Sequence, residues 1–313
     1  MKTIFLGTPA FAVPSLERLA AEGHQIAAVF TQPDRPSGRG RKPAASPVKE
    51  AALRMGLPVL QPERIRNPEV VQQIAAIGPE VMVVVGYGQI IPQSIIDLPP
   101  LGIINVHASL LPRYRGAAPI QWAIARGETV TGVTTMRIDA GLDTGDILMS
   151  RETTIGPEET APELAGRLAV MGADLLAATL RGLQAGTLKP LPQDHSLATY
   201  APILKREDGL IDWNWPAETI FNRCRGFLPW PGTYTYFRGQ LLHVWKARVA
   251  PERDTGAPGT LHPAGRRLLA ACGGGSTLEL LELHMEGRKR MSASEFLNGQ
   301  RVLENETLGE QPK

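Results

Sequence analysis

The sequence predicts an α/β protein, with a Rossmann-like, mostly parallel sheet that carries helices on both faces and a smaller β domain after it. Short apolar runs alternate with segments of helical spacing through the first 185 residues, which is typical of a doubly wound parallel sheet. Beyond a proline-rich stretch at 190–206, short apolar runs follow one another with turn residues between them, which indicates a small β-barrel or sandwich. A chain of 313 residues is long enough for two such domains.

The elements of the first domain follow from two spacings. Strands are apolar runs bounded by Gly, Pro or polar turns, and helices repeat apolar residues three and four positions apart. Strands are expected at 2–6, 25–31, 58–60, 81–85, 102–107, 133–138 and 147–155, and helices at 10–21, 49–55, 68–77, 117–126 and 160–185. The continuous run Val81–Val85 predicts a central strand that is buried on both faces.

The second domain is expected to begin after an extended linker. Pro190, Pro192 and Pro202 interrupt any periodicity, so the predicted division is 1–189, a linker at 190–206, and 207–313. Within the last part we expect one helix at 217–224, followed by strands at 232–237, 241–249, 267–271 and 277–283.

Ligands of doubly wound sheets bind beyond the carboxyl ends of the strands. That rule brings the turns at 7–9 and 86–89 together with the turn that follows residue 107. The first turn, Gly7-Thr8-Pro9, lacks the second and third glycines of a dinucleotide fingerprint, and the chain has no Walker-type Gly-Lys-Ser/Thr. The sequence therefore predicts a Rossmann-like sheet without a dinucleotide.

The chain is organised around the stretch at 102–116. Asn105 and His107 stand two residues apart in a strand, so their side chains point to the same face. A carboxamide and an imidazole in that position can donate to, or exchange protons with, a small carbonyl compound. The alternative is that both side chains only satisfy backbone groups near the strand end.

A second candidate loop, Asp139–Asp146, contains two glycines and three acids. Such a loop can close tightly over a ligand and bring a carboxylate beside His107. The alternative is an ordinary charged hairpin loop.

Composition indicates which compartment, membrane contacts and metal content to expect for the protein. The chain is 43% hydrophobic and 20% charged, as is usual for globular proteins, and its two cysteines form neither a disulfide framework nor a metal-binding spacing. The N-terminal apolar run is too short for a signal peptide or a spanning helix. We therefore expect a cytoplasmic monomer without a metal and without a membrane contact.

Basic residues gather in one segment although the net charge is only +2. Residues 31–66 carry eight Lys or Arg against three acids, whereas residues 207–313 carry thirteen of each. A polyanion would be attracted first to the basic segment, and the alternative is a solvated loop. Prolines and glycines between residues 33 and 47 predict that this insert has no regular structure.

Two motifs carry a resemblance to a known family. Residues 105–112 (NVHASLLP) and 139–145 (DAGLDTG) resemble the signature of 10-formyltetrahydrofolate-dependent formyltransferases. Three further stretches, at 5–13, 31–42 and 227–232, are similar to the branch of that family whose members formylate methionyl-tRNA. The resemblance spans nearly the whole chain.

The resemblance implies transfer of the formyl group from N10 of 10-formyltetrahydrofolate to the amino group of methionyl-initiator tRNA. The family's catalytic Asn, His and Asp match Asn105, His107 and Asp143. Residues matching the family's folate contacts are Ser109, Leu110, Leu111, Pro112, Tyr87, Gly88, Gln89, Ile90, Ile91, Asp139 and Gly141. Those matching its tRNA contacts are Arg35, Arg39, Arg41 and Lys42 in the basic insert, with Arg206 as a further candidate. The C-terminal domain resembles an OB-like β-barrel that helps to hold the tRNA.

The chemistry agrees with these residues. An amine that attacks the formyl carbon creates a negative oxygen, which Asn105 and His107 can stabilise by about 3 kcal/mol per donor. Asp143 can hold the tautomer of His107. Asp143, His107 or a water molecule could take the amine proton, and the sequence leaves this choice open.

Three other functions use the same residues. A formyltransferase of this fold could act on a small amine such as a nucleotide sugar or purine precursor, although the basic insert and the Pro-Trp-Pro stretch at 229–231 argue against it. A hydrolytic relative would release formate without an amine acceptor. An RNA-binding module could carry a decayed site, although Asn105, His107 and Asp143 are intact.

Overall fold

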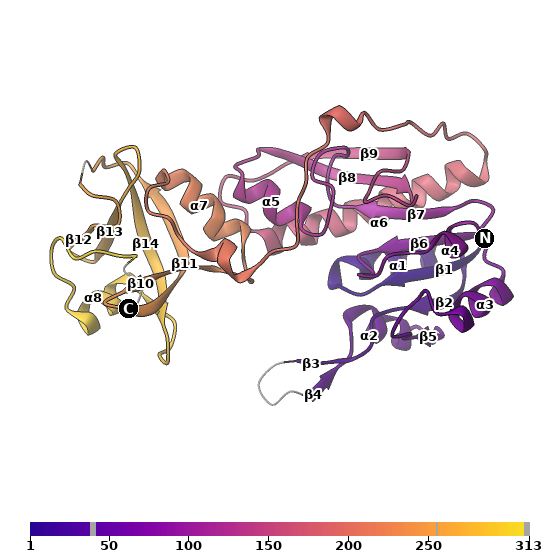
Figure 1. The fold of residues 1–313 in the computed structure, drawn as a ribbon, viewed down its shortest axis with the longest axis horizontal. Helices are drawn as coiled ribbons and strands as arrows, with labels where there is room; N and C mark the ends of the chain where they lie inside the picture. The colour runs from indigo at the N-terminus through magenta and orange to yellow at the C-terminus, as the bar shows by residue number, and fades with distance from the viewer. Residues whose placement is uncertain (38–41, 255, 310–313) are drawn as a thin grey trace. The chain divides into compact units, whose positions relative to one another are not determined.

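The computed structural model describes residues 1–37, 42–254 and 256–309, with side chains left out at 36, 37, 42 and 43. It divides into two compact units (Figure 1). The N-terminal unit comprises Met1–Pro119, Val130–Thr154 and Ala165–Ala201. The C-terminal unit comprises Ile120–Thr129, Ile155–Leu164 and Pro202–Lys313.

A seven-stranded sheet in the order β5-β2-β1-β6-β7-β8-β9 forms the centre of the N-terminal unit. Its strands are β1 (Lys2–Gly7), β2 (Gln25–Phe30), β5 (Val59–Leu60), β6 (Val81–Val85), β7 (Ile103–His107), β8 (Val130–Arg137) and β9 (Ile147–Thr154). Neighbours from β5 to β7 are parallel, and β8 and β9 join antiparallel. The predicted mostly parallel, Rossmann-like sheet is confirmed.

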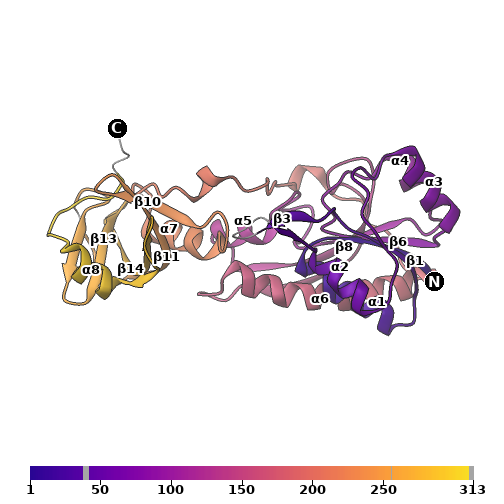
Figure 2. The ribbon, with the colours of Figure 1, turned by 90° about the horizontal axis from the view of Figure 1, so that it is seen from below.

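Helices cover both faces of this sheet, as predicted. They are α1 (Val13–Ala21), α2 (Pro47–Arg54), α3 (Pro68–Ile77), α4 (Gln93–Ile96) and α6 (Ala161–Gln184), whereas α5 (Pro119–Ala125) belongs almost wholly to the C-terminal unit. Figure 2 shows α3 and α4 on one side of the sheet and α1, α2 and α6 on the other. Ile4 and Met82 pack with Ile74 of α3 in one apolar cluster, because alternate residues of a buried strand face opposite layers. The short helix α4 was not predicted.

The basic insert contains a two-stranded ribbon, so the prediction that it lacks regular structure was wrong. Strand β3 (Arg35–Ser37) pairs antiparallel with β4 (Lys42–Ala44), and Pro36 lies opposite Pro43. Opposed residues in an antiparallel pair alternate between positions that exchange hydrogen bonds and positions that do not. Neither proline has an N–H, so this pair occupies a position that exchanges no hydrogen bonds, and the ladder loses none. A count of prolines cannot reveal how they are paired.

The C-terminal unit is β-barrel-like and consists of an antiparallel sheet in the order β10-β11-β14-β13-β12, with β15 paired to β14. The strands are β10 (Thr233–Phe237), β11 (Gln240–Ala250), β12 (Leu261–Ala264), β13 (Arg267–Cys272), β14 (Ser276–Met285) and β15 (Met291–Ser292). Two helices accompany them, α7 (Ala217–Gly226) and α8 (Ala293–Gln300). The strands β12 and β15 and the helix α8 were not predicted.

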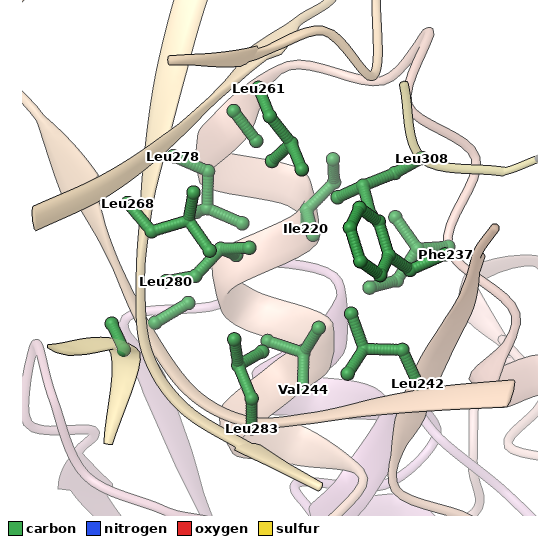
Figure 3. Packing of buried hydrophobic residues seen from close by; sticks show 14 of the residues in the cluster. Ile220, Phe237, Leu242, Val244, Leu261, Leu268, Leu278, Leu280, Leu283 and Leu308 are labelled. Atoms are coloured by element: carbon green, nitrogen blue, oxygen red, sulfur yellow. The ribbon is translucent and has the colours of Figure 1, made fainter. Parts of the chain in front are cut away.

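Apolar side chains from every part of this sheet meet over α7. Figure 3 shows Ile220 of α7 among Phe237, Leu242, Leu261 and Leu280, all fully buried. Burial of a side chain of this size stabilises the fold by about 2 kcal/mol relative to exposure. No helix among the described residues is both long and apolar enough to cross a membrane.

Candidate active site

Asn105 and His107 lie at the carboxyl end of β7, and both face the loop between β8 and β9. Asn105 Nδ2 lies 3.3 Å from Asp143 Oδ1, and His107 Nδ1 lies 3.7 Å from Asp143 Oδ2. His107 is 6% exposed. The structure therefore brings together the three residues that the sequence analysis selected, one of them 36 to 38 residues away from the others along the chain.

The two ring nitrogens of His107 have different partners. Nε2 lies 2.9 Å from the carbonyl oxygen of Tyr114, and because a carbonyl can only accept, Nε2 carries a proton. Nδ1, the other ring nitrogen, faces the Asp143 carboxylate. From the sequence, only Asp143 was expected to hold the tautomer, and the contact with the Tyr114 carbonyl was not predicted.

Asp143 adopts a left-handed backbone conformation, with φ of 52°. Its Oδ2 accepts a 2.8 Å hydrogen bond from the backbone N–H of Gly116. Earlier in the loop, Asp139 Oδ1 accepts from the Gly141 N–H at 3.0 Å and from Thr144 Oγ1 at 2.7 Å. The Asp139 carboxylate thus shapes the loop from within.

Glycine is required where this loop passes the last residue of β8 just before β9, and at Gly116, whose N–H contacts the Asp143 carboxylate. A Cβ at Gly145 would lie 1.9 Å from the Arg137 carbonyl oxygen. Gly116 has φ of 114°, and a Cβ there would lie 2.7 Å from the Ala201 carbonyl oxygen. Both close approaches involve backbone atoms, so a side chain at Gly145 would displace the loop, and one at Gly116 would push the backbone of Gly116 and Ala201 apart.

The segment after His107 is tied to β8 by Thr134. Its Oγ1 donates to the Ser109 carbonyl at 2.7 Å and accepts from the Leu111 N–H at 3.2 Å, while Ser109 Oγ donates to the Arg113 carbonyl at 2.7 Å. Ser109 and Leu111 are buried, and Leu110 and Pro112 are partly exposed. Of the four predicted folate contacts in this segment, Leu110 and Pro112 have accessible side chains.

The predicted folate contacts after β6 divide in the same way. Tyr87 is 1% exposed and packs in the apolar core, where burial raises its pKa to about 12. Gln89 Oε1 accepts from the Ile65 N–H at 2.7 Å, and Ile91 is buried. Ile90 is 90% exposed, and Gly88 presents backbone. Side chains of Tyr87, Gln89 and Ile91 therefore support the loop, and Ile90 with the Gly88 backbone is left to meet a ligand.

The predicted tRNA contacts lie in two places. Arg35 is exposed on β3, and Arg39 and Arg41 lie outside the described residues. Lys42 lies on β4, in the part of the insert whose side chains are not described. Arg206 belongs to the C-terminal unit, where its guanidinium lies 5.9 Å from the centre of the Tyr234 ring.

The base of the insert is held by an ion pair. Asp34 accepts from Lys49 Nζ at 2.6 Å and from Gln61 Nε2 at 2.8 Å. These hydrogen bonds lower the pKa of the Asp34 carboxyl group. Among the described residues, no group of three or more His, Cys, Asp or Glu side chains could hold a metal ion.

Two family models match the chain. The formyl transferase model covers residues 1–180, and the model of the formyl transferase C-terminal domain covers residues 203–301. The chain is 64% identical over 310 residues to the methionyl-tRNA formyltransferase of Solibacter usitatus, a match that covers 99% of each chain. It is 56% identical to that of Koribacter versatilis, again over 99% of each chain.

Solved structures share the fold at lower identity. A Helicobacter canadensis N-formyltransferase in complex with folinic acid and dTDP-3-aminofucose matches with a TM-score of 0.67 and 19% identity, over 90% of this chain and 98% of that one. HypX of Aquifex aeolicus in complex with tetrahydrofolic acid matches with a TM-score of 0.64 and 16% identity, over 95% of this chain and 47% of that one.

Proposed function

Because the chain belongs to the methionyl-tRNA formyltransferase family, we propose that Asn105, His107 and Asp143 carry out the transfer that defines this family. The protein transfers the formyl group of 10-formyltetrahydrofolate to the amino group of methionyl-initiator tRNA. The observation that supports the residue assignment is the convergence of a carboxamide, an imidazole and a carboxylate within 3.7 Å at the carboxyl end of β7.

Each of the three side chains has a role that its contacts support. The amine nitrogen forms a bond to the formyl carbon, and the electron pair of the carbonyl moves onto its oxygen. Asn105 Nδ2 carries two hydrogens, so it can donate one to that oxygen and the other to Asp143. His107 Nδ1 and the Asp143 carboxylate lie where they can receive the proton that the amine loses.

Collapse of the tetrahedral intermediate breaks the bond between the formyl carbon and N10. The electron pair stays on N10, which takes up a proton, and the formyl group remains on the methionine nitrogen. The proton held by the His107–Asp143 pair is the source that balances this step. Direct transfer needs no covalent intermediate on the protein, and we propose that it proceeds without a metal.

The binding residues are proposed from the same contacts. The folate lies against the exposed Ile90, the Gly88 backbone, and Leu110 and Pro112, with Asp139 and Gly141 shaping the opposite loop. The basic insert, through Arg35, Arg39, Arg41 and Lys42, binds tRNA phosphates, and Arg206 adds a contact from the C-terminal unit.

We also propose a catalytic domain at 1–189, a connection at 190–206 and a tRNA-binding domain at 207–313, in a cytoplasmic monomer. The 64% identity to a methionyl-tRNA formyltransferase over 99% of each chain favours this function over transfer to a small amine or hydrolysis of the donor.

The acceptor is tested by offering 10-formyltetrahydrofolate with methionyl-initiator tRNA, methionyl-elongator tRNA and free methionine in parallel. We expect rapid formylation of the first acceptor alone. Release of formate without an acylated product would instead make the protein a hydrolase, and equal use of the three acceptors would remove the role of tRNA in recognition.

A further inference from the structure

Two buried polar side chains beside the site have no part in the mechanism above. Arg115 is 2% exposed and Gln193 is 7% exposed, and both belong to the N-terminal unit. A buried guanidinium and a buried carboxamide are costly unless their hydrogen-bonding groups are used, so their partners indicate what they do. Nothing in the sequence indicated a role for Arg115, or for Gln193 within the predicted linker at 190–206.

The contacts of Arg115 determine how the Gln193 carboxamide is oriented. Arg115 Nε and Nη2 donate to Gln193 Oε1 at 3.1 and 2.6 Å. Because a guanidinium has only donors, the oxygen of the carboxamide must face it, and the NH₂ group must face the other way. Arg115 Nη2 also donates to His195 Nδ1 at 3.0 Å, which fixes the guanidinium from the same segment.

The NH₂ group of Gln193 is directed at the loop that carries Asp143. Nε2 donates to the carbonyl oxygens of Asp143 at 2.9 Å and of Gly145 at 2.7 Å. These carbonyls flank Thr144, so one carboxamide holds both ends of the tripeptide 143–145. Asp143 has a left-handed backbone, a conformation that a non-glycine residue keeps only when its surroundings impose it.

Arg115 lies between the two backbone groups that contact the catalytic side chains. The carbonyl oxygen of Tyr114 accepts from His107 Nε2, and the N–H of Gly116 donates to Asp143 Oδ2. The backbone of Arg115 is itself paired with the segment after Gln193: its N–H donates to the Thr199 carbonyl at 2.8 Å, and its carbonyl accepts from the Ala201 N–H at 2.7 Å.

We propose that Gln193 is a positioning residue for the formyl transfer. Its carboxamide, oriented by Arg115, holds the backbone of Asp143 so that the carboxylate faces His107 Nδ1 and Asn105. This inference rests on the proposed roles of these three residues. Displacement of a catalytic group by about 1 Å costs up to a hundredfold in rate, so loss of the carboxamide should act on kcat.

The test compares two substitutions in the full-length protein under saturating 10-formyltetrahydrofolate and methionyl-initiator tRNA. Gln193→Met keeps the length of the side chain and removes all its hydrogen bonds. Gln193→Glu keeps an oxygen for Arg115 and turns the other oxygen toward the carbonyls of Asp143 and Gly145. We expect kcat to fall about 10- to 100-fold in both variants, with KM for the tRNA within about twofold of wild type.

A second measurement separates positioning from general stability. In the Asp143→Asn background, where the carboxylate is already lost, Gln193→Met should reduce the single-turnover rate less than twofold. Thr179→Val, which removes a buried hydrogen bond to Thr135 in the same unit, serves as the matched control and should lower stability without changing kcat.

Three results would overturn the inference. They are an unchanged kcat in Gln193→Met, a wild-type kcat in Gln193→Glu, or an equal loss of rate from Gln193→Met in the wild-type and Asp143→Asn backgrounds. The outcomes are distinct from failure of the proposed function. If the wild-type protein does not formylate the tRNA, the function fails; if it does and Gln193→Met does too at the wild-type rate, only this inference fails.

Discussion

His107 shows how a single backbone atom sets the chemistry of a side chain. The carbonyl of Tyr114 fixes the proton on Nε2, and Nδ1 faces Asp143, where we propose that it exchanges a proton. Tyr114 can offer that carbonyl because its own backbone is left-handed, with φ of 59°, and because its N–H donates to Thr199 Oγ1 at 2.9 Å. The tautomer of His107 therefore depends on the backbone of Tyr114 and on Thr199, which holds that backbone.

The charge of Asp143 is open to a direct test. Asp143→Asn keeps the shape of the side chain and removes the group that can take a proton, so kcat should fall by about 10² to 10⁴ while affinity for the tRNA stays within about twofold. Single-turnover formylation and tRNA binding measure the two quantities.

The matched control for this change is Asp97→Asn. Asp97 is an exposed carboxylate of the same unit that accepts a hydrogen bond from Gln93 at 2.7 Å. Its variant should retain wild-type kcat. A loss of less than tenfold in Asp143→Asn would contradict a catalytic role for the carboxylate.

At the level of secondary structure, the three proposed catalytic groups come from one strand end and one loop, whereas the described part of the basic insert forms a separate ribbon. The insert begins and ends in the ribbon of β3 and β4, which is closed at its base by the Asp34–Lys49 pair. The pair therefore ties the base of the ribbon to α2, which carries Lys49.

The insert makes a prediction about salt dependence. Arg39→Ala should weaken binding of the tRNA, and the slope of log K against log salt should become shallower by about one, because one phosphate contact is lost. KM for 10-formyltetrahydrofolate should not change. Binding titrations at several salt concentrations provide the measurement.

The matched control for the insert is Arg54→Ala. Arg54 is an exposed arginine on α2 whose Nη2 lies 3.8 Å from Glu17 Oε1. If both variants alter the slope equally, the effect is one of net charge and the insert has no specific role.

At the level of the whole molecule, the two cysteines make the stability of the C-terminal unit depend on pH. Cys224 and Cys272 are buried in its core, and burial raises the pKa of Cys224 to about 11 and that of Cys272 to about 12. Each thiol is therefore protonated in the folded state at a pH where the unfolded chain, with its ordinary pKa of 9.0, releases the proton.

The sign of the pH effect follows from these values. The folded state binds more protons than the unfolded state above pH 9.0, so the contribution of the thiols is complete below that pH and is lost as the pH rises toward 11 and 12. At pH 10 the loss is about 1 kcal/mol for each thiol.

Urea unfolding at pH 7.5 and pH 10 measures this loss. The variant with Cys224→Ala and Cys272→Ala should be less stable at pH 7.5, because it contains cavities, but its stability should fall less between the two pH values. An equal fall in both proteins would show that the thiols do not contribute to the pH dependence.

Much of this molecule could be predicted from short stretches of sequence. Strands such as Val81–Val85 are specified by their own apolar residues, and Asn105 and His107 share a face because their spacing matches the repeat of a strand. The C-terminal β domain was also expected, although β12, β15 and α8 were missed. These features are local, and a local pattern is enough to specify them.

Other features depend on contacts between distant parts of the chain, and the sequence did not reveal them. The pairing of Pro36 with Pro43 is a matter of register, and the role that we propose for Gln193 depends on Asp143 and Arg115, which are 50 and 78 residues away. Tyr114 acts on His107 through a carbonyl that every residue has. What a buried hydrogen-bonding group does depends on which partners it contacts. Such groups can therefore be recognised only in the folded structure.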